Sequence, residues 1–323
     1  MKIQFHIGTG GPNYPWLDLD PAKIGIGGSE EALSYMKREL EILGHQVTAI
    51  QSRFSGSLNY LEPGQHLDCD IFIAWRDWRL YEQAPVGSKR YLWCHDIPVE
   101  PHWDHEAALH FDRIILLNEH HARLYEAAGC PREKMFIASN GVDLAQFDQQ
   151  VLRVPGKCIY FSHPHRGLHK LREYWPKIRA AVPHATLNAF WWEDGFFLPP
   201  DESLGIMPMR SLGHEELARE ILSSDCLTYP SVFDHEINPI TCIKSQVGGA
   251  WPVTVNCGGM ADTLQFGDST DHAGFAEEVI LRLQTSPTHG FSRREMIRLS
   301  RERYDWRNIS RLWESEFLQQ LQK

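Results

Sequence analysis

The sequence has no surplus of positive charge. Its 32 lysines and arginines stand against 42 aspartates and glutamates, which gives a formal net charge of −10. A protein that binds nucleic acid by neutralising phosphates needs the opposite balance, so we expect no nucleic-acid partner. Peripheral membrane contact stays open, and on an anionic surface it would need a local basic patch. The sequence does not indicate an oligomeric state.

Long apolar runs and cysteine motifs are also absent. No stretch approaches the roughly 20 apolar residues that cross a bilayer. The first residues, MKIQFHIGTGG, are typical of a strand that enters a glycine loop rather than of a signal peptide. The seven cysteines are scattered, and no two are spaced as Cys-x-x-Cys. Isolated thiols in odd number are typical of a reducing compartment, so we expect a cytoplasmic protein.

Several sequence fingerprints of cofactor and metal sites are missing. There is no P-loop, no Gly-x-Ser-x-Gly elbow, and no set of three or four metal-ligand residues at convincing spacing. A dinucleotide fingerprint is broken, because Gly8 and Gly10 fit but Asn13 stands where the third glycine belongs. We therefore expect no cofactor and no metal. An oxidoreductase or epimerase with a nicotinamide cofactor is the less favoured interpretation.

What the sequence does contain is a repeated alternation of short apolar runs with amphipathic stretches. Ile3, Phe5 and Ile7 alternate as in a half-buried strand, and residues 29–43 have helical spacing that ends at Gly44. The alternation continues to the end of the chain. It predicts an α/β protein built from parallel strand–helix–strand units.

The alternation weakens between residues 143 and 157, which indicates a linker. With 323 residues the chain is long enough for two domains. We expect a first Rossmann-like domain over residues 1–152 and a second over 153–305. A final helix over 306–323 carries an apolar stripe and must pack on something. Ligands of open parallel sheets bind at the carboxyl ends of the strands, which suggests a cleft between the two sheets.

The run Gly27-Gly28-Ser29-Glu30 stands directly at the start of the first predicted helix. Glycines at this place let backbone N–H groups approach an anion, and the helix dipole adds to the attraction. The same run is equally compatible with a flexible loop and an ordinary helix cap.

Five segments, in order along almost the whole chain, resemble the motifs of family 4 glycosyltransferases, which have the GT-B fold of two facing Rossmann-like domains. They are Gly27-Gly28-Ser29-Glu30 with Leu43-Gly44-His45; Asn140-Gly141-Val142-Asp143 with Phe147; Ser162 to Leu168; Glu236-Ile237-Asn238-Pro239-Ile240; and Gly248 to Val253 with Gly258-Gly259. The resemblance implies a C-terminal helix that returns to the first domain. It also implies a retaining, metal-independent hexosyltransferase of glycan biosynthesis.

The resemblance implies that a nucleotide-diphosphate sugar is the co-substrate. Arg166 would hold the diphosphate, since a guanidinium binds phosphate oxygens in bidentate fashion. Glu236 would contact hydroxyls of the transferred sugar. The earlier Arg of the family pattern is absent, and His163, His165 and Lys170 are the nearest substitutes. The donor-binding residues expected are Gly27, Gly28, Ser162, Arg166, Lys170, Met209, Leu212, Glu236, Asn238, Pro239, Ile240, Thr241 and Lys244.

The first domain would supply the acceptor side, for a saccharide or another hydroxyl compound. His95 follows a predicted strand, and the resemblance implies that it faces the reacting sugar. With Arg166 and Glu236 it completes the expected catalytic set. Aromatic residues interleaved with arginine suit a sugar ring or an anionic acceptor, so Trp75, Arg76 and Trp78 are expected to bind the acceptor. Asp96, which could orient His95 or cap a turn, is the fourth expected acceptor-binding residue. A packed loop with extended arginines explains the same pattern.

One position departs from the family pattern. The family places a second Glu after the first to hold the ribose hydroxyls, and this chain has Lys244 there. An ammonium group cannot accept hydrogen bonds from hydroxyls. The sequence therefore predicts a retaining glycosyltransferase. The alternative is a catalytically impaired nucleotide-sugar-binding or scaffold protein of the same fold.

Overall fold

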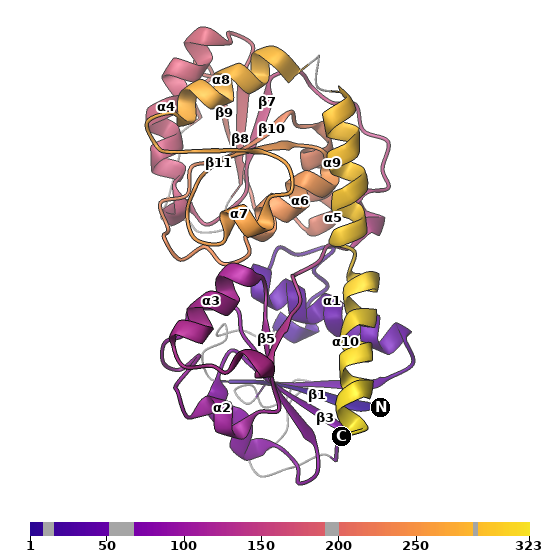
Figure 1. Cartoon of the computed structure of the whole chain (residues 1–323). Coiled ribbons are helices and arrows are strands. Elements are labelled where there is room, and N and C mark those ends of the chain that lie inside the picture. The colour runs from indigo at the N-terminus through magenta and orange to yellow at the C-terminus, as the bar shows by residue number, and fades with distance from the viewer. Residues whose placement is uncertain (9–15, 52–67, 191–199, 287–289) are drawn as a thin grey trace. The chain divides into compact units, whose positions relative to one another are not determined.

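The computed structural model (Figure 1) describes residues 1–8, 16–51, 68–190, 200–286 and 290–323. Gly10 and Asn13 of the broken fingerprint lie outside the described residues. The chain forms two compact units. Unit 1 consists of Met1–Asp20, Ile26–Gly141 and Trp306–Lys323, and unit 2 consists of Pro21–Gly25 and Val142–Asp305.

Unit 1 is built on a parallel sheet in the order β2-β1-β3-β4-β5-β6. Strand β3 is apolar and buried along its whole length, as expected of a central strand in a parallel sheet covered on both faces. The direction in which strands are added reverses between β1 and β3. The strands are β1 (Lys2–Ile7), β2 (Gln46–Gln51), β3 (Ile71–Trp75), β4 (Lys89–Trp93), β5 (Arg113–Leu116) and β6 (Met135–Ile137).

The C-terminal helix α10 (Trp306–Leu321) belongs to unit 1, as expected. The Trp313 ring of this helix packs edge-on against Trp93, with ring centroids 4.7 Å apart. The Phe317 ring packs edge-on against Tyr91, with centroids 4.9 Å apart. The helix also packs beside α1 (Gly28–Ile42). The apolar stripe seen in the sequence is therefore buried on the first sheet. The other helices of unit 1 are η1 (Trp16–Asp18), η2 (Trp78–Gln83), α2 (Ala107–His110), α3 (Glu119–Ala127) and η3 (Arg132–Lys134).

Unit 2 is built on a second parallel sheet in the order β12-β11-β10-β7-β8-β9. Counted along the chain this is the doubly wound order of dinucleotide-binding sheets, with the reversal between β7 and β10. The strands are β7 (Lys157–Tyr160), β8 (Thr186–Phe190), β9 (Ile206–Met209), β10 (Cys226–Tyr229), β11 (Trp251–Val255) and β12 (Asp268–Thr270).

The helices of unit 2 cover this sheet. Helix α4 packs on α8, and α6 packs on α5 and α9 (Figure 1). None of the helices in the described part of the chain is long and apolar enough to cross a membrane. The helices are η4 (Leu144–Phe147), η5 (Pro164–Arg166), α4 (Leu168–Ala181), α5 (His214–Ser223), α6 (Ile240–Gly248), α7 (Met260–Thr263), α8 (Phe275–Thr285) and α9 (Gly290–Arg303).

The predicted architecture of two parallel α/β sheets is confirmed, but two details differ from the expectations. The compact units divide after Gly141 rather than at residue 152, because η4 already packs on α5 and α6. Pro21–Gly25 joins unit 2, where the backbone carbonyls of Pro21 and Ala22 accept hydrogen bonds from the first N–H groups of α5.

Candidate functional site

The reversal point of the second sheet lies where β7 and β10 end side by side. In open parallel sheets this is where ligands bind. Ser162 follows β7, and its hydroxyl donates to the phenol oxygen of Tyr229, the last residue of β10, at 3.3 Å. Ser231 follows β10 and is fully buried. A chain of hydroxyl groups therefore lines the reversal point.

Gly167 brings the turn after β7 against the end of β10. Its φ is +120°, and a Cβ at this position would lie 2.0 Å from the carbonyl oxygen of Pro230. Only glycine combines this backbone conformation with such a close approach. The preceding turn η5 carries Arg166, which is thereby held beside the reversal point.

Arg166 and Glu236 form an ion pair at the reversal point. Arg166 Nη1 lies 2.7 Å from Glu236 Oε2. The other carboxylate oxygen, Oε1, accepts hydrogen bonds from the hydroxyl groups of Ser231, at 3.0 Å, and Tyr229. The guanidinium also lies over the ring of Phe233, 4.6 Å from its centroid. The structure thus joins two residues that the sequence assigns to different parts of the donor.

The electrostatics of this cluster keep Arg166 charged and Tyr229 protonated. Burial alone would lower the pKa of Arg166, but the charge of Glu236, the Tyr229 phenol and the hydrogen bonds to both together outweigh burial and raise the pKa. Burial, together with Glu236, raises the pKa of the Tyr229 phenol well above its usual value. The phenol is therefore a permanent donor to Glu236. The guanidinium has five N–H donors, and its side chain is 37% exposed.

The amino end of α6 follows Glu236 directly. Pro239 is the N-cap, and Ile240 begins the helix. The Thr241 hydroxyl in the first turn is buried and has no hydrogen-bond partner in the described part of the chain. Asn238 donates to the Thr263 hydroxyl at 3.2 Å, so its side chain supports the loop. The first N–H groups of α6 are suited to an anion.

Lys244 lies inside unit 2, on the buried side of α6. It is 4% exposed. Burial, helped by the positive charge of Lys244, lowers the pKa of His214 to about 2. His214 begins α5, and Leu212 lies in the short segment between Met209, the last residue of β9, and this helix. The structure therefore brings Lys244 near the start of α5, which directly follows the segment of the expected donor-binding residue Leu212.

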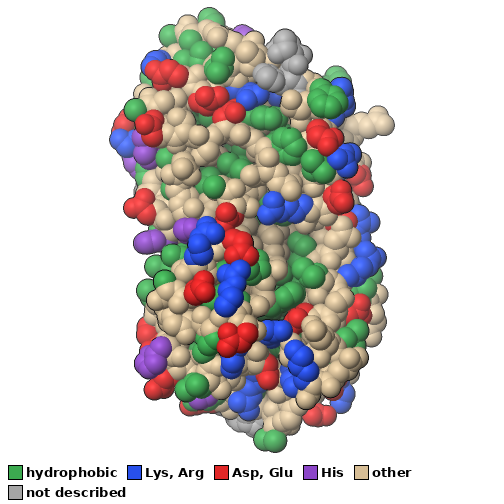
Figure 2. Space-filling model, viewed as in Figure 1, with side chains coloured by type: hydrophobic (Ala, Val, Ile, Leu, Met, Phe, Trp, Pro, Cys, Tyr) green, Lys and Arg blue, Asp and Glu red, His purple; other side chains and the backbone are tan. Residues whose placement is uncertain are grey.

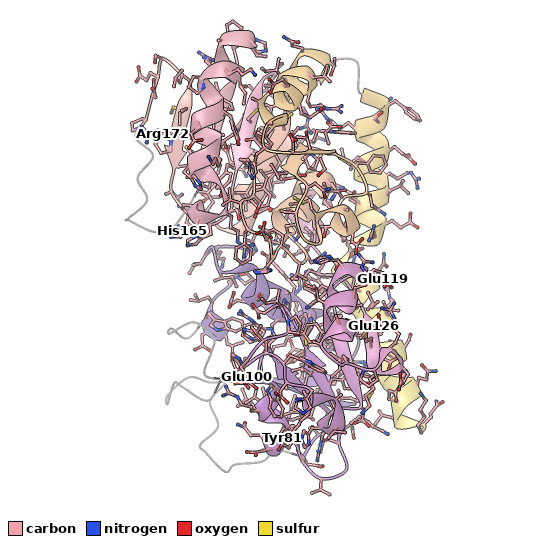
Figure 3. All side chains as sticks on the ribbon, turned by 60° about the vertical axis from the view of Figure 1, so that its left-hand side comes forward. Tyr81, Glu100, Glu119, Glu126, His165 and Arg172 are labelled. Atoms are coloured by element: carbon pink, nitrogen blue, oxygen red, sulfur yellow. The ribbon has the colours of Figure 1, made fainter. Side chains whose placement is uncertain are left out.

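Lys170 does not join this cluster. It lies on α4 and pairs with Glu173, its Nζ 2.9 Å from the carboxylate. In the turn before α4, the His165 N–H donates to the ring of His163 at 3.3 Å, and the two rings stack with centroids 5.0 Å apart. Figure 3 shows His165 at this turn and Arg172 further along α4.

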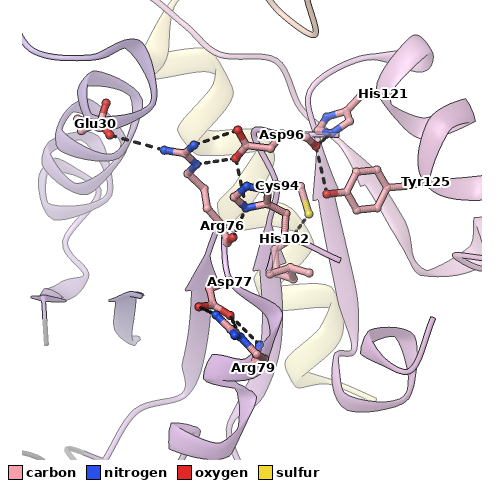
Figure 4. Close-up of polar contacts among 10 residues, drawn as sticks. Glu30, Arg76, Asp77, Arg79, Cys94, Asp96, His102, His121 and Tyr125 are labelled. Carbon is pink, nitrogen blue, oxygen red and sulfur yellow. Dashed lines mark hydrogen bonds and ion pairs between the residues drawn. The ribbon is translucent and has the colours of Figure 1, made fainter. Parts of the chain in front are cut away.

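A second charged cluster stands at the carboxyl ends of β3 and β4 in unit 1 (Figure 4). Arg76 binds Asp96 with two hydrogen bonds, Nε to Oδ2 at 2.6 Å and Nη2 to Oδ1 at 2.9 Å. Its Nη1 lies 3.7 Å from Glu30 Oε1. Arg76 has a φ of +62°, which is strained for a residue other than glycine. Its carbonyl oxygen accepts a hydrogen bond from the ring of His102 at 2.6 Å.

Two of these acids have shifted pKa values. Burial raises the pKa of the Glu30 carboxyl, and Arg76 offsets only part of this. For Asp96 burial acts in the same direction, but the hydrogen bonds and charge of Arg76 outweigh it and lower the pKa. Glu30 also stands close to the glycines expected to bind an anion: a Cβ on Gly27 would lie 2.1 Å from Glu30 Oε2. The carboxylate of Glu30 therefore lies at the amino end of α1, which begins at Gly28.

His95 and Trp75 are packed against each other. The ring of His95 lies 4.7 Å from Trp93 and 6.0 Å from Trp75, and its Nε2 is buried without a hydrogen-bond partner in the described part of the chain. Burial, with the nearby charge of Arg76, lowers its pKa to about 3, so the ring is neutral. Trp75 is only 1% exposed. Its ring therefore supports His95 and does not present a surface for stacking.

Trp78 is partly exposed in a stack of rings. It lies parallel to Tyr81, with ring centroids 5.8 Å apart, and Tyr81 stacks on His110 at 3.7 Å. The indole N–H donates to Glu100 Oε1 at 3.1 Å. Tyr81 and Glu100 are labelled in Figure 3. Aromatic rings beside a carboxylate suit a sugar.

Buried groups behind Asp96 fix its backbone. Its carbonyl oxygen accepts hydrogen bonds from the His121 ring at 2.9 Å and from the Tyr125 hydroxyl at 3.2 Å. Neither was among the expected site residues, and neither was Tyr229 or Ser231. Tyr229 ends a buried strand, and Ser231 is close to Glu236 in sequence. Their link to Arg166 through Glu236 joins segments far apart in the sequence, so sequence reasoning could not find it.

Charged side chains of both signs are mixed on the surface, and the possible metal ligands of the described residues do not cluster. Figure 2 shows Lys and Arg side chains interspersed with Asp and Glu over the visible face. Among the described residues, no group of three or more His, Cys, Asp or Glu side chains could hold a metal ion. All seven cysteines are unpaired; six are buried, and Cys257 is partly exposed.

No protein-family model and no curated protein matches the sequence. Solved structures match over nearly the whole chain. The sucrose-phosphate synthase of Thermosynechococcus elongatus matches with a TM-score of 0.71 at 14% identity, covering 99% of both chains. HepE of Anabaena in complex with UDP matches with a TM-score of 0.70 at 14% identity, covering 99% of this chain and 100% of that one.

A third solved structure is AviGT4, a glycosyltransferase involved in avilamycin A biosynthesis. It matches with a TM-score of 0.68 at 15% identity, covering 99% of this chain and 98% of that one. At these identities the likeness concerns the fold. The chain therefore has the GT-B fold, with two Rossmann-like parallel sheets, that the sequence motifs led us to expect.

Proposed function

We propose that this protein is a glycosyltransferase that moves a sugar from a nucleotide-diphosphate sugar to an acceptor hydroxyl. The observation that carries the proposal is the Arg166–Glu236 pair at the reversal point of the second sheet. It places a permanently charged, partly exposed guanidinium where doubly wound sheets bind nucleotides. HepE, which has the same fold, has been solved in complex with UDP-glucose, and a UDP-sugar is our first choice of donor.

In this proposal unit 2 holds the donor. Arg166 donates its remaining N–H groups to the diphosphate, and the amino end of α6 at Ile240 and Thr241 adds backbone donors. Both stabilise the negative charge that develops as the sugar leaves. Glu236 is buried and fully engaged with Tyr229, Ser231 and Arg166. We therefore assign Glu236 the positioning of Arg166 rather than a direct contact with sugar hydroxyls.

Unit 1 supplies the acceptor side. The neutral ring of His95 is suited to a hydrogen bond with a sugar hydroxyl rather than to a charge. Arg76 and Asp96 form a fixed polar pair, and Trp78 offers a partly exposed ring. We propose a saccharide acceptor on this basis.

We propose a retaining outcome without a metal ion. The bond from sugar C1 to the phosphate oxygen breaks, and its electron pair leaves with the nucleotide. The acceptor oxygen forms its bond to C1 on the same face, and its proton passes to the leaving phosphate oxygen. Such a step needs no pair of carboxylates flanking the sugar, in contrast to double displacement.

Calorimetric titration with UDP tests the donor site. Arg166→Ala should weaken binding by roughly ten- to hundredfold, since a charge-assisted hydrogen bond contributes about 1.5–3 kcal/mol. Arg172→Ala is the matched control, because Arg172 is an exposed arginine on α4 of the same unit. Equal affinity of both variants and the wild type would remove Arg166 from the site.

The alternative is a nucleotide-sugar-binding protein that has lost transfer. The observation that favours it is the buried Lys244 beside His214, where the related motif has a carboxylate. Such a protein would bind UDP through Arg166 but would release no sugar from any nucleotide-sugar, with or without saccharide acceptors.

A further inference from the structure

A cavity of about 580 Å³ opens at the carboxyl ends of β10, β11 and β12 in unit 2. This volume lies within the range of small-molecule pockets, roughly 300–1,000 Å³. None of its lining residues is among the donor- or acceptor-binding residues expected from the sequence. Its polar lining residues include Ser231, Asp234, Asn256, Cys257, Asp271 and His272.

The lining has the chemistry of a site for hydroxyl groups. Asp234 and Asp271 supply carboxylates, which accept hydrogen bonds from hydroxyls, and the Asn256 amide both donates and accepts. Asp271 uses Oδ1 to accept the Gly274 N–H at 2.7 Å, a bond that leaves Oδ2 for a ligand. No lysine or arginine is among the described residues that line the cavity. Two carboxylates without a lysine or an arginine disfavour a phosphate or a carboxylate ligand.

The cavity shares a wall with the Arg166–Glu236 pair. Ser231 lines the cavity and also donates its hydroxyl hydrogen to Glu236 at 3.0 Å. Cys257 lies on the loop after β11, and burial together with the negative charge of Glu236 raises the pKa of its thiol. A ligand in the cavity would therefore lie next to the site proposed for the diphosphate but would not occupy it.

We propose that this cavity binds an uncharged saccharide, with the Asp234 and Asp271 carboxylates as the groups that recognise its hydroxyls. That this saccharide takes part in sugar transfer rests on the proposed function. It enters either as a free sugar or as the sugar of the donor, and the two sources share the same chemistry in this cavity.

Cys257 offers an internal probe of occupancy. It lines the cavity and is the one cysteine of the seven that is not buried. Burial and the charge of Glu236 raise its pKa to about 11, so alkylation with iodoacetamide is followed at mildly alkaline pH, where some thiolate is present. The rate is read from the modified Cys257 peptide by mass spectrometry, with glucose, galactose, mannose, N-acetylglucosamine, UDP or UDP-glucose added.

The variants are Asp234→Asn and Asp271→Asn, with Glu277→Gln as the matched control. Glu277 is an exposed carboxylate on α8 outside the cavity. We expect at least one of the sugars, or UDP-glucose beyond UDP alone, to slow alkylation in the wild type and in Glu277→Gln. Each Asp variant should need at least tenfold more sugar for the same protection, equivalent to about 1.4 kcal/mol.

Protection by a free sugar identifies a free-saccharide site, and protection by UDP-glucose alone identifies the sugar of the donor. The proposal is overturned if no sugar protects Cys257, if UDP protects as well as UDP-glucose while free sugars do nothing, or if all three variants are protected equally. Arg166-dependent UDP binding without protection of Cys257 would overturn the saccharide site and leave the proposed function. Protection of Cys257 by free sugars without any UDP binding would support the saccharide site and contradict the proposed function.

Discussion

Arg166 and Glu236 are joined at 2.7 Å, yet the Glu236 side chain is 2% exposed and the Arg166 side chain is 37% exposed. The Glu236 carboxylate is buried and holds the Arg166 guanidinium in place, and this guanidinium is partly exposed to solvent. A buried carboxylate is tolerated only if its hydrogen bonds are satisfied. Here Tyr229, Ser231 and Arg166 satisfy them. Glu236 thus orients the positively charged Arg166 side chain at the reversal point of the second sheet.

Removing Arg166 alone should destabilise unit 2, because it leaves a buried carboxylate with one partner fewer. We expect Arg166→Ala to lower the free energy of unfolding by about 2 kcal/mol, measured by urea denaturation. The double variant Arg166→Ala/Glu236→Gln should regain most of this loss, since the uncompensated charge is gone. Purely additive effects of the two substitutions would show that the ion pair has no energetic role.

Gly167 should be irreplaceable for nucleotide binding. Gly167→Ala places a methyl group 2.0 Å from the Pro230 carbonyl oxygen and forces a left-handed φ on alanine. We expect the turn that carries Arg166 to shift, with a loss of UDP affinity of at least tenfold by calorimetry. Gly290→Ala is the control, because the nearest atom to its added Cβ is 3.5 Å away. Unchanged UDP affinity in Gly167→Ala would contradict this role of the turn.

Most strands and helices could be predicted from the sequence, because a parallel sheet with amphipathic helices leaves a regular apolar pattern. Helix α9 leaves almost no apolar pattern in the sequence, because Met296 and Ser300 are its only fully buried side chains. Strands β9 and β12 lack a buried apolar run, since Ile206 is the only one of their side chains that is fully buried. The Arg166–Glu236 contact could not be predicted, because it joins two loops that only the sheet order brings together.

Local residue type does not show how deeply a side chain is buried. Trp75 is expected at an acceptor surface, but it ends the fully buried strand β3, and its indole packs against His95. Lys170 is expected to bind the donor, and in this structure it pairs with Glu173.

His121 should make the protein less stable in acid. Its Nδ1 accepts the Leu117 N–H at 3.2 Å, and its Nε2–H donates to the Asp96 carbonyl, so both ring nitrogens are engaged in the neutral form. Burial is the main cause that lowers its pKa to about 4. Below the unfolded pKa near 6.5 the unfolded chain gains a proton that the folded chain does not. Stability is therefore lost as the pH falls from about 6.5 toward 4.

The expected cost from His121 at pH 5 is about 2 kcal/mol relative to pH 7. Urea denaturation at both pH values measures it. His121→Gln cannot titrate in this range, so its stability should change less between the two pH values by about that amount. An identical pH dependence in this variant would mean that His121 takes up its proton in the folded state.

Lys244 should control the titration of His214. Burial is the larger cause of the low His214 pKa of about 2, and the ammonium of Lys244 is the second. Lys244→Met keeps the length of the side chain and removes the charge, so the His214 pKa should rise but stay below 6.5. Lys244→Glu should raise it further. NMR titration of the histidine ring measures both, and an unchanged pKa in Lys244→Glu would place the ammonium away from His214.

The central claim is that this chain transfers sugar, and the most direct measurement is proton NMR of the anomeric signal during turnover. The wild type is incubated with UDP-glucose, then with other nucleotide-sugars, in the presence of saccharide acceptors. We predict that the donor signal is consumed and that a product of the same anomeric configuration appears, at a rate strongly reduced in Arg166→Ala and preserved in Arg172→Ala. Consumption of no nucleotide-sugar by the wild type, while UDP still binds, would contradict the account.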